Sequence, residues 1–310
     1  MREVLRHEQH RIIRLGTELC TATNVNPEDV PNPKKTSGEV RESLKKQHNK
    51  NWKNKPQHGY LFNKQQAQPD IDNESTNAWL NDRFRTSHIE GYICAIQEQE
   101  IRTRQLINKR ENNESNPKCR FCKTMDESIF HILNSCSHLS VSMYLPVRHN
   151  EVAKALYYEI LKVFNITNEE RKTPDSTFRT KKVEIWWDKE ITVQPTVKHN
   201  RPDIVLWDLE KKKCTIIDIC IPLDVNVSRE EKVKCDRYFL LASRLQRLYP
   251  QYTYEIVPVA VGSTGYIPKT LHGHLERCGI RKDNIYPTIR QLQRKALQGS
   301  VKIVKTAMKM

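Results

Sequence analysis

The sequence Asn200-Arg-Pro-Asp-Ile-Val-Leu-Trp-Asp-Leu-Glu-Lys-Lys-Lys-Cys-Thr-Ile-Ile-Asp-Ile-Cys-Ile-Pro222 decides the fold of the C-terminal half of this chain. It contains two apolar runs, 203–207 and 214–221, which are rich in the Val, Ile and aromatic residues that favour strands. The segment between them, 208–213, is polar and has the composition of a hairpin turn. The stretch therefore predicts two neighbouring strands joined by a turn.

Further strands and helices are predicted on both sides of this hairpin. Residues 183–187 and 254–261 have the same strand-like composition. A long helix is predicted over 229–248, because apolar residues recur there at three- and four-residue steps. Two more helices, at 268–278 and 284–303, complete an α/β domain over 176–310.

Two carboxylates mark the hairpin as a candidate site. Asp203 follows a proline at the start of the first strand, and Asp218 interrupts the second strand, which is otherwise almost wholly apolar. A buried, unpaired carboxylate costs several kcal/mol, so Asp218 requires a cation or a hydrogen-bonding partner. Carboxylates on adjacent strands can converge on one divalent ion. On this motif alone, structural salt bridges are the more frequent explanation.

A second candidate site is the motif Cys119-x2-Cys122-x8-His131-x4-Cys136. Two cysteines two residues apart can present both sulfurs to one ion, and a downstream histidine and cysteine complete a tetrahedral set. Thiolates with one imidazole select zinc over magnesium or calcium. The motif predicts a structural zinc site, with His138 as a less favoured substitute ligand and the other cysteines as core or surface thiols.

The N-terminal half divides into two regions by composition. Residues 1–75 are poorly patterned, and 32–55 is dominated by Lys, Asn, Gln, Ser and Pro, which predicts a basic, largely flexible segment. The same basic segment could alternatively track a nucleic-acid backbone. A short amphipathic pattern occupies 2–19.

From residue 77 onward apolar residues recur at helical spacing, and 149–164 is predicted as a further helix. Residues 165–179 are polar and are interrupted by Pro174, so they predict a boundary. The predicted organisation is a basic segment over 1–75, a mostly helical region with the Cys/His motif over 76–170, and the α/β domain.

The charge balance indicates a polyanionic partner. Lys and Arg number 52 against 37 Asp and Glu, giving a formal net charge of +15. Nucleic acid is the commonest such partner, through counterion release, and a solvated basic surface without a partner is the alternative. No apolar run approaches the roughly 18 residues of a membrane span, and the N-terminus lacks the apolar region of a secretory signal. Nine cysteines without such a signal indicate a reducing compartment.

In their order along the chain, these motifs resemble the C-terminal region of non-LTR retrotransposon polyproteins of the restriction-like-endonuclease class. Ala95-Ile-Gln-Glu-Gln-Glu-Ile-Arg-Thr-Arg104 is similar to the helix before the family's zinc knuckle, and Arg148-His149-Asn-Glu-Val152 to the segment after it. Asn200-Arg-Pro-Asp203, Asp218-Ile-Cys-Ile-Pro222 and Val261-Gly-x-x-Gly265 match the endonuclease in order.

The resemblance implies a CCHC zinc knuckle followed by a PD-(D/E)xK nuclease, with a restriction-endonuclease-like mixed sheet flanked by helices. It implies structural Zn²⁺ at the Cys/His motif and catalytic Mg²⁺ or Mn²⁺ at Asp203 and Asp218. The position where the pattern has lysine is Cys220, so the catalytic cation moves to the following helix. The resemblance favours Lys234, four residues before Tyr238. Two neighbours remain alternatives: Lys232 and Arg237.

The function implied is nicking of double-stranded DNA in the nucleus, or in the cytoplasm before import, with element RNA as a second ligand. Nothing in the chain resembles a polymerase palm, so the chain is expected to nick or bind DNA without copying it. The resemblance leaves open a truncated element copy, a separate fragment with a reverse transcriptase as another subunit, or a host protein derived from the element. The alternatives are a catalytically inactive nucleic-acid-binding remnant of the same element and an inert open reading frame.

Overall fold

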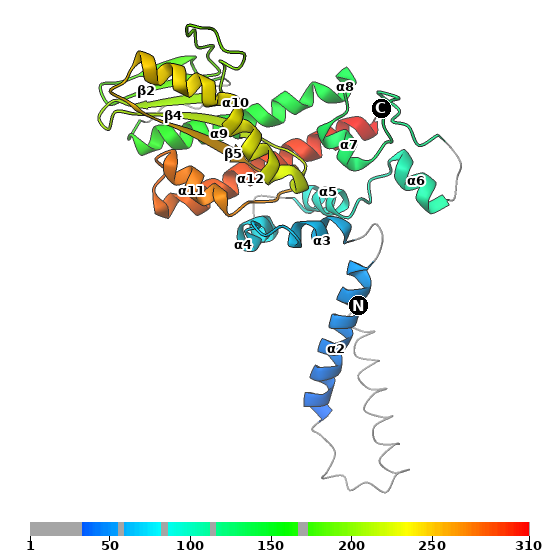
Figure 1. Ribbon diagram of the computed structural model, residues 1–310. Helices are drawn as coiled ribbons and strands as arrows, with labels where there is room; N and C mark the ends of the chain where they lie inside the picture. The colour runs from blue at the N-terminus through cyan, green and yellow to red at the C-terminus, as the bar shows by residue number, and fades with distance from the viewer. Residues whose placement is uncertain (1–32, 55–58, 82–85, 112–115, 167–172, 310) are drawn as a thin grey trace, which may run out of the picture. The chain divides into compact units, whose positions relative to one another are not determined.

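The computed structural model describes residues 33–54, 59–81, 86–111, 116–166 and 173–309 (Figure 1). The chain divides into two compact units, Met1–Tyr60 and Leu61–Met310, and the second is called the C-terminal unit below. The amphipathic pattern at 2–19 lies outside the described residues.

Helix α2 (Pro33–Lys53) belongs to the first unit, and it corrects the prediction of a flexible segment over 32–55. Its side chains from 41 to 51 are exposed, so no described side of this stretch is buried. The segment is rich in Lys, Arg, Glu and Gln, which have high helix propensities and form helix without an apolar face. The lack of an apolar face in the sequence therefore does not exclude a helix here.

The C-terminal unit contains one five-stranded mixed sheet in the order β1-β2-β3-β4-β5, and the fold is mixed α/β as predicted. All neighbouring strands are antiparallel except β4 and β5, which are parallel. The four predicted strands are confirmed to within one residue at each end, and β1 is additional. The bounds are β1 Thr177–Arg179, β2 Val183–Trp187, β3 Ile204–Asp208, β4 Lys213–Cys220 and β5 Thr253–Ala260.

Alternation along β4 sends its side chains to two different cores. Ile217 and Ile219 face a core built with α9, α11 and α12, whereas Cys214 and Ile216 face a core built with α10. Figure 1 shows α10 on one side of the sheet and α9 and α12 on the other. β4 is therefore buried on both faces, which explains its nearly unbroken apolar sequence.

Most helices of the C-terminal unit either pack around the sheet or lie in the part of the chain that precedes it. None of the helices in the described part of the chain is long and apolar enough to cross a membrane. The bounds are α3 Tyr60–Gln66, α4 Asn73–Asn77, η2 Ala78–Asn81, α5 Ser87–Gln97, α6 Arg104–Glu111, α7 Ile129–Asn134, α8 Leu139–Ser142, α9 Tyr144–Val163, η3 Asp224–Asn226, α10 Val227–Leu248, α11 Thr270–Arg277 and α12 Lys282–Lys309.

The long helix α12 joins two cores. Its first half contributes Ile289 and Leu292 to the core beneath the sheet. Its second half contributes Val301 and Val304 to a core shared with α5 and α7 and with Cys119 and Cys136 of the Cys/His motif. The helical region and the sheet region consequently pack as parts of one compact unit, although the sequence between them is polar.

Residues 61–75 correct the predicted N-terminal region, because they belong to the C-terminal unit and pack within it instead of forming a flexible segment. Leu61 and Ile71 are only 2% and 5% exposed. Ile71 forms an isolated antiparallel bridge with Pro268, and the amide of Asp72 donates to the carbonyl of Ile267 at 2.9 Å. These anchors have no regular spacing, so the sequence shows no periodic signal for them.

Gln293 of α12 fastens this docked segment to the sheet region. Its Nε2 donates to the carbonyls of Ser75 and Thr76, both at 3.0 Å, and to that of Gly265 at 2.6 Å. Gln293 is buried, so its loss removes a buried donor from these carbonyls, of which that of Ser75 retains the amide of Ala78.

We expect Gln293→Ala to lower the free energy of unfolding by about 1–3 kcal/mol, the cost of leaving buried polar groups unsatisfied. Urea denaturation followed by circular dichroism measures it, with Gln246→Ala on the exposed side of α10 as the matched control. Equal stability of the two variants would contradict this role.

Candidate functional site

A tight loop presents the first two cysteines of the Cys/His motif. The amide of Cys119 donates to the carbonyl of Met125 at 2.8 Å, and the amide of Lys123 donates to the carbonyl of Cys119 at 3.0 Å. Lys123 has φ +61°, which turns the chain back on itself. The loop therefore directs Cys119 and Cys122 to one side.

Helix α7 supplies His131, and Cys136 follows two residues after the end of the helix. The hydroxyl of Ser128 caps α7 by accepting from the amide of His131 at 3.1 Å. The amide of Cys136 donates to the carbonyl of His131 at 2.9 Å, which brings Cys136 back over the helix end.

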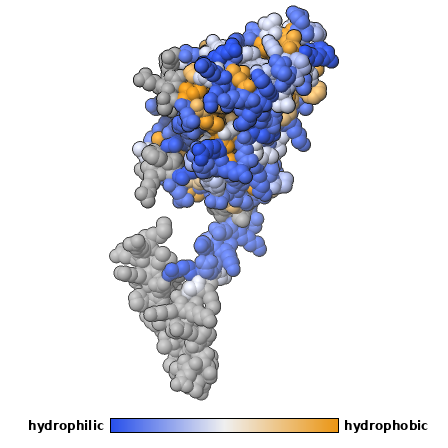
Figure 2. Space-filling model, turned by 90° about the vertical axis from the view of Figure 1, so that its left-hand side faces the viewer, coloured by the Kyte–Doolittle hydropathy of each residue, from blue (hydrophilic) through white to orange (hydrophobic). Residues whose placement is uncertain are grey.

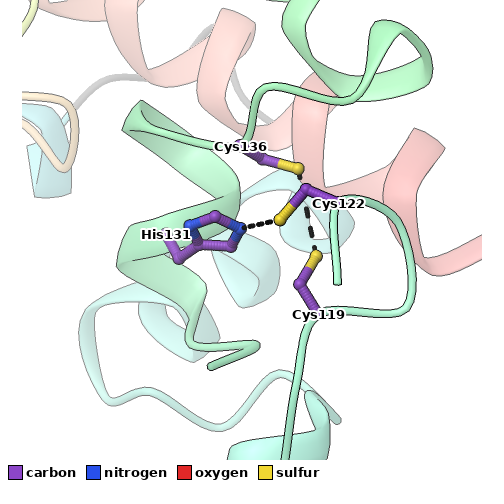
Figure 3. Close-up of side chains that lie close together, drawn as sticks. All are labelled: Cys119, Cys122, His131 and Cys136. Carbon is purple, nitrogen blue, oxygen red and sulfur yellow. Dashed lines mark hydrogen bonds between the residues drawn. The ribbon is translucent and has the colours of Figure 1, made fainter. Parts of the chain in front are cut away.

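The four side chains converge (Figure 3). Their ligand atoms all lie within 4.8 Å of one another, so this Cys3His cluster (Cys119, Cys122, His131, Cys136) could bind a metal such as zinc. The sulfurs of Cys119 and Cys136 are 3.9 Å apart, and Cys122 Sγ is 3.3 Å from His131 Nε2. Tetrahedral zinc with bonds of about 2.3 Å to sulfur places two sulfurs about 3.8 Å apart.

Two neighbouring groups hold the cluster in place. Ser135 Oγ lies 3.2 Å from His131 Nδ1, which leaves Nε2 directed at Cys122. Glu127 is fully buried, and it accepts from the amide of Arg104 at 3.0 Å and from the guanidinium of Arg120.

The electrostatics of the cluster favour a thiolate at Cys122. Burial raises the pKa of this thiol, but hydrogen bonds from Thr124, Met125 and His131 outweigh it and lower the pKa to about 5. His138 stands outside the cluster and caps α8, its Nδ1 accepting from the amide of Ser140 at 3.3 Å. Cys94 is exposed, and Cys214, Cys220 and Cys278 are buried away from the cluster.

The hairpin brings the two predicted acids together. In the antiparallel register Ile204 pairs with Ile217, so continuing it by one residue sets Asp203 opposite Asp218. Asp203 lies in the bend just before β3, so the register brings the two carboxylates close together while each is paired from a different layer. Burial raises the pKa of Asp218, and the charge of Asp203 raises it further.

Asp218 is buried beneath α10 and is paired from that helix. Its Oδ2 forms an ion pair with Lys234 Nζ, and its Oδ1 accepts from the hydroxyl of Tyr238 at 2.9 Å. The same tyrosine hydroxyl is 3.1 Å from the carbonyl of Arg201, which ties α10 to the start of β3. Lys234 and Tyr238 are one helical turn apart, so both reach down to the sheet.

Asp203 is paired from the opposite layer. Its Oδ2 accepts from the amide of Ile219 at 2.6 Å and lies 3.2 Å from His149 Nε2 of α9. The same nitrogen is 3.1 Å from the carbonyl of Ile219. Burial lowers the pKa of His149, but the hydrogen bond and charge of Asp203 outweigh it and raise the pKa to about 9. The ring is therefore cationic at neutral pH.

The remaining predicted residues lie farther from the acids. Lys232 is exposed on α10, and Arg237 is half-buried at the side of the groove described next. The sequence alone predicts no role for His149 or for the hydroxyl of Tyr238. His149 lies in the segment 148–152 that resembles the retrotransposon family, but only the fold brings it to Asp203.

A groove of about 940 Å³ in the C-terminal unit runs from His131 of the Cys3His cluster to His149 and Lys234, the partners of the two acids. At one end it is lined by Lys118, His131 and other residues around the Cys3His cluster, and at the other by His149, Lys234 and Arg237. Cys220 and the residues after it form part of its wall. Figure 2 shows one face of the molecule, where apolar areas lie among mostly hydrophilic side chains.

Comparison with protein-family models and with curated proteins gives no match for this chain. The two sites are therefore interpreted from their geometry and chemistry.

The Cys3His cluster predicts a structural role for a bound metal. We expect one zinc per chain, with Cys122→Ser losing it, and chelation of the metal releasing thiols and unfolding the core that contains Cys119 and Cys136. Metal analysis, thiol titration and near-UV circular dichroism measure these changes, and Cys94→Ser is the matched control. A metal-free protein with unchanged folding would rule the site out.

Proposed function

We propose that this chain is a metal-dependent DNA endonuclease related to the C-terminal region of non-LTR retrotransposon polyproteins. The observation that carries the proposal is the placement of Asp203 and Asp218 close together at the end of β3 and β4, with Lys234 paired to one of them. This combination is what a PD-(D/E)xK nuclease requires, with the lysine supplied by a helix in place of Cys220.

The oxygen atoms around the two acids suit a hard divalent cation. Asp203 Oδ2 and the carbonyl of Ile219 both contact the cationic His149 Nε2, at 3.2 and 3.1 Å. These two oxygens thus already accommodate a positive group, and the Asp218 carboxylate stands beside them. Mg²⁺ and Mn²⁺ prefer such oxygen ligands. A bound ion would lower the pKa of the attacking water and polarise the scissile phosphoryl group.

The chain's own residues would prepare the site for that ion. Lys234 is held by Asp218, so its ammonium can stabilise charge that develops on the scissile phosphate or orient the attacking water. Tyr238 fixes the Asp218 carboxylate through its hydroxyl and is a positioning residue. His149 plays the same part for Asp203 from the other layer.

The groove supports double-stranded DNA as the substrate, with element RNA as a second proposed ligand. Cationic side chains line it at both ends. Arg237 can neutralise a phosphate, and Lys118 can do so by exchanging its partner Asp126, 3.1 Å away. The Cys3His cluster would act as a zinc knuckle that holds nucleic acid at the far end. The proposal includes a nuclear site of action, or a cytoplasmic location before import, and a reverse transcriptase on a separate subunit.

Nicking of supercoiled plasmid with Mg²⁺ or Mn²⁺ tests the proposal. We expect Asp203→Ala, Asp218→Ala and Lys234→Ala each to lower the nicking rate by roughly 100-fold or more, because each removes a charge that acts in the transition state. Lys232→Ala should retain nicking, since Lys232 is exposed on α10. Asp283→Ala, an exposed acid at the start of α12, is the matched control.

Nicking that persists in both aspartate variants would remove the proposed site. A wild-type chain that binds DNA in a salt-sensitive manner but never cuts it would instead support the inactive nucleic-acid-binding remnant.

Cys220 occupies the position where the nuclease pattern has lysine. Residues 218 and 220 share a face of β4, and Lys234 electrostatically influences Cys220. We expect Cys220→Lys to restore part of the nicking lost in Lys234→Ala, because the new ammonium reaches the same phosphate from the strand. Cys94→Lys adds the same charge at an exposed position and is the control. Cys278→Lys is less suitable, because Cys278 is buried and the variant serves as a control only if it folds. If the folded double variant Cys220→Lys/Lys234→Ala recovers no nicking, Lys234 does not act on the phosphate as proposed.

A further inference from the structure

The outer side of α10 is the most apolar exposed surface on any described helix of the chain. Phe239 is 64% exposed and Leu240 58%, and Val233 and Leu248 of the same helix are also exposed. α10 packs against β4, β5 and η3. On the other side of the sheet α9 and α12 form a mutually packed layer, as Figure 1 shows.

Four residues form a straight line along this outer side. Asp236, Leu240, Ser243 and Arg247 follow one another at steps of four, three and four residues, the spacing of a helix–helix seam. The line, called the α10 seam here, is about 16 Å long at 1.5 Å per residue. It begins with an acid, ends with a base and has a leucine and a small residue between them.

The order of charges makes the α10 seam complementary to itself. When two copies of the seam lie antiparallel, Asp236 of each copy faces Arg247 of the other, and each Leu240 faces the small side chain of Ser243. Among the residues that the structure describes, neither Asp236 nor Arg247 forms an ion pair within the single chain. Both charges are therefore available to a second copy, and symmetry doubles every contact.

The polar residue in the middle of the seam does not oppose burial. The hydroxyl of Ser243 donates to the carbonyl of Phe239 within the same helix at 2.9 Å. Covering Ser243 therefore leaves no unsatisfied hydroxyl donor. Phe239 lies beside the seam and would add apolar area to the contact.

We propose that the α10 seam is a docking surface for a second copy of this chain, in an antiparallel two-fold arrangement. This inference goes beyond the proposed nuclease function and does not depend on it. A nucleic acid is a poorer occupant, because it offers nothing to Leu240 and the opposite charges of Asp236 and Arg247 cancel. The seam is short and the chain carries a net charge of +15, so the dimer is weak, reversible and concentration-dependent.

Sedimentation velocity on the full chain over a concentration series tests the proposal. The wild type should show a monomer–dimer equilibrium whose weight-average mass rises with concentration. Asp236→Arg and Arg247→Asp should each remain monomeric, because each places like charges opposite one another. The double variant Asp236→Arg/Arg247→Asp should dimerise again, because it exchanges the two partners.

Two controls apply the same charge changes away from the seam. Asp283→Arg and Lys282→Asp, both at the exposed start of α12, should leave the equilibrium unchanged. Far-UV circular dichroism establishes that each variant is folded. A wild-type chain that is monomeric at every concentration overturns the proposal, as does a folded double variant that stays monomeric while the wild type dimerises.

Discussion

The approach of two negatively charged side chains at the end of one hairpin is the constraint on which this structure depends. The register between β3 and β4 sets Asp203 opposite Asp218, in a part of the molecule where Asp218 is almost fully buried. Two carboxylates in that position repel each other and lose their hydration. The surrounding fold offsets this cost from two directions, with Lys234 above the sheet and His149 below it.

That requirement explains why helices from separate parts of the chain meet at this point. α10 must cross the sheet with Lys234 and Tyr238 turned inward, which leaves its other side exposed. α9 must present His149 from the opposite layer, and α12 packs against α9 along its length. Because α12 also contributes to the core around the Cys3His cluster, the two candidate sites are held in one compact unit on a shared groove.

Much of this arrangement can be predicted from the sequence. The strands that carry the acids are visible as apolar runs, and the four Cys and His residues are visible through their spacing. β1 is missed because Thr177–Arg179 is a short strand in a polar segment. The docking of residues 61–75 is missed because its anchors, such as Gln65 with Asp224, are single long-range contacts without period.

The sequence contains the information needed to choose between the candidate lysines of α10. Tyr238 and Leu241 are buried, and Lys234 lies one turn before Tyr238, so helical phase alone turns it toward the sheet and turns Lys232 away. His149 offered no comparable signal, since its partner Asp203 lies on a distant strand and only the packing of α9 beneath the sheet joins them. Contacts between layers depend on the fold and leave no local pattern.

The central claim is that Asp203 and Asp218 together form a site for a divalent cation. Titration of the zinc-loaded protein with Mn²⁺, followed by electron paramagnetic resonance, tests it without depending on cleavage. The account predicts one saturable Mn²⁺ site per chain that is lost in Asp203→Asn and in Asp218→Asn. No saturable binding, or the same binding in both folded variants, would contradict it.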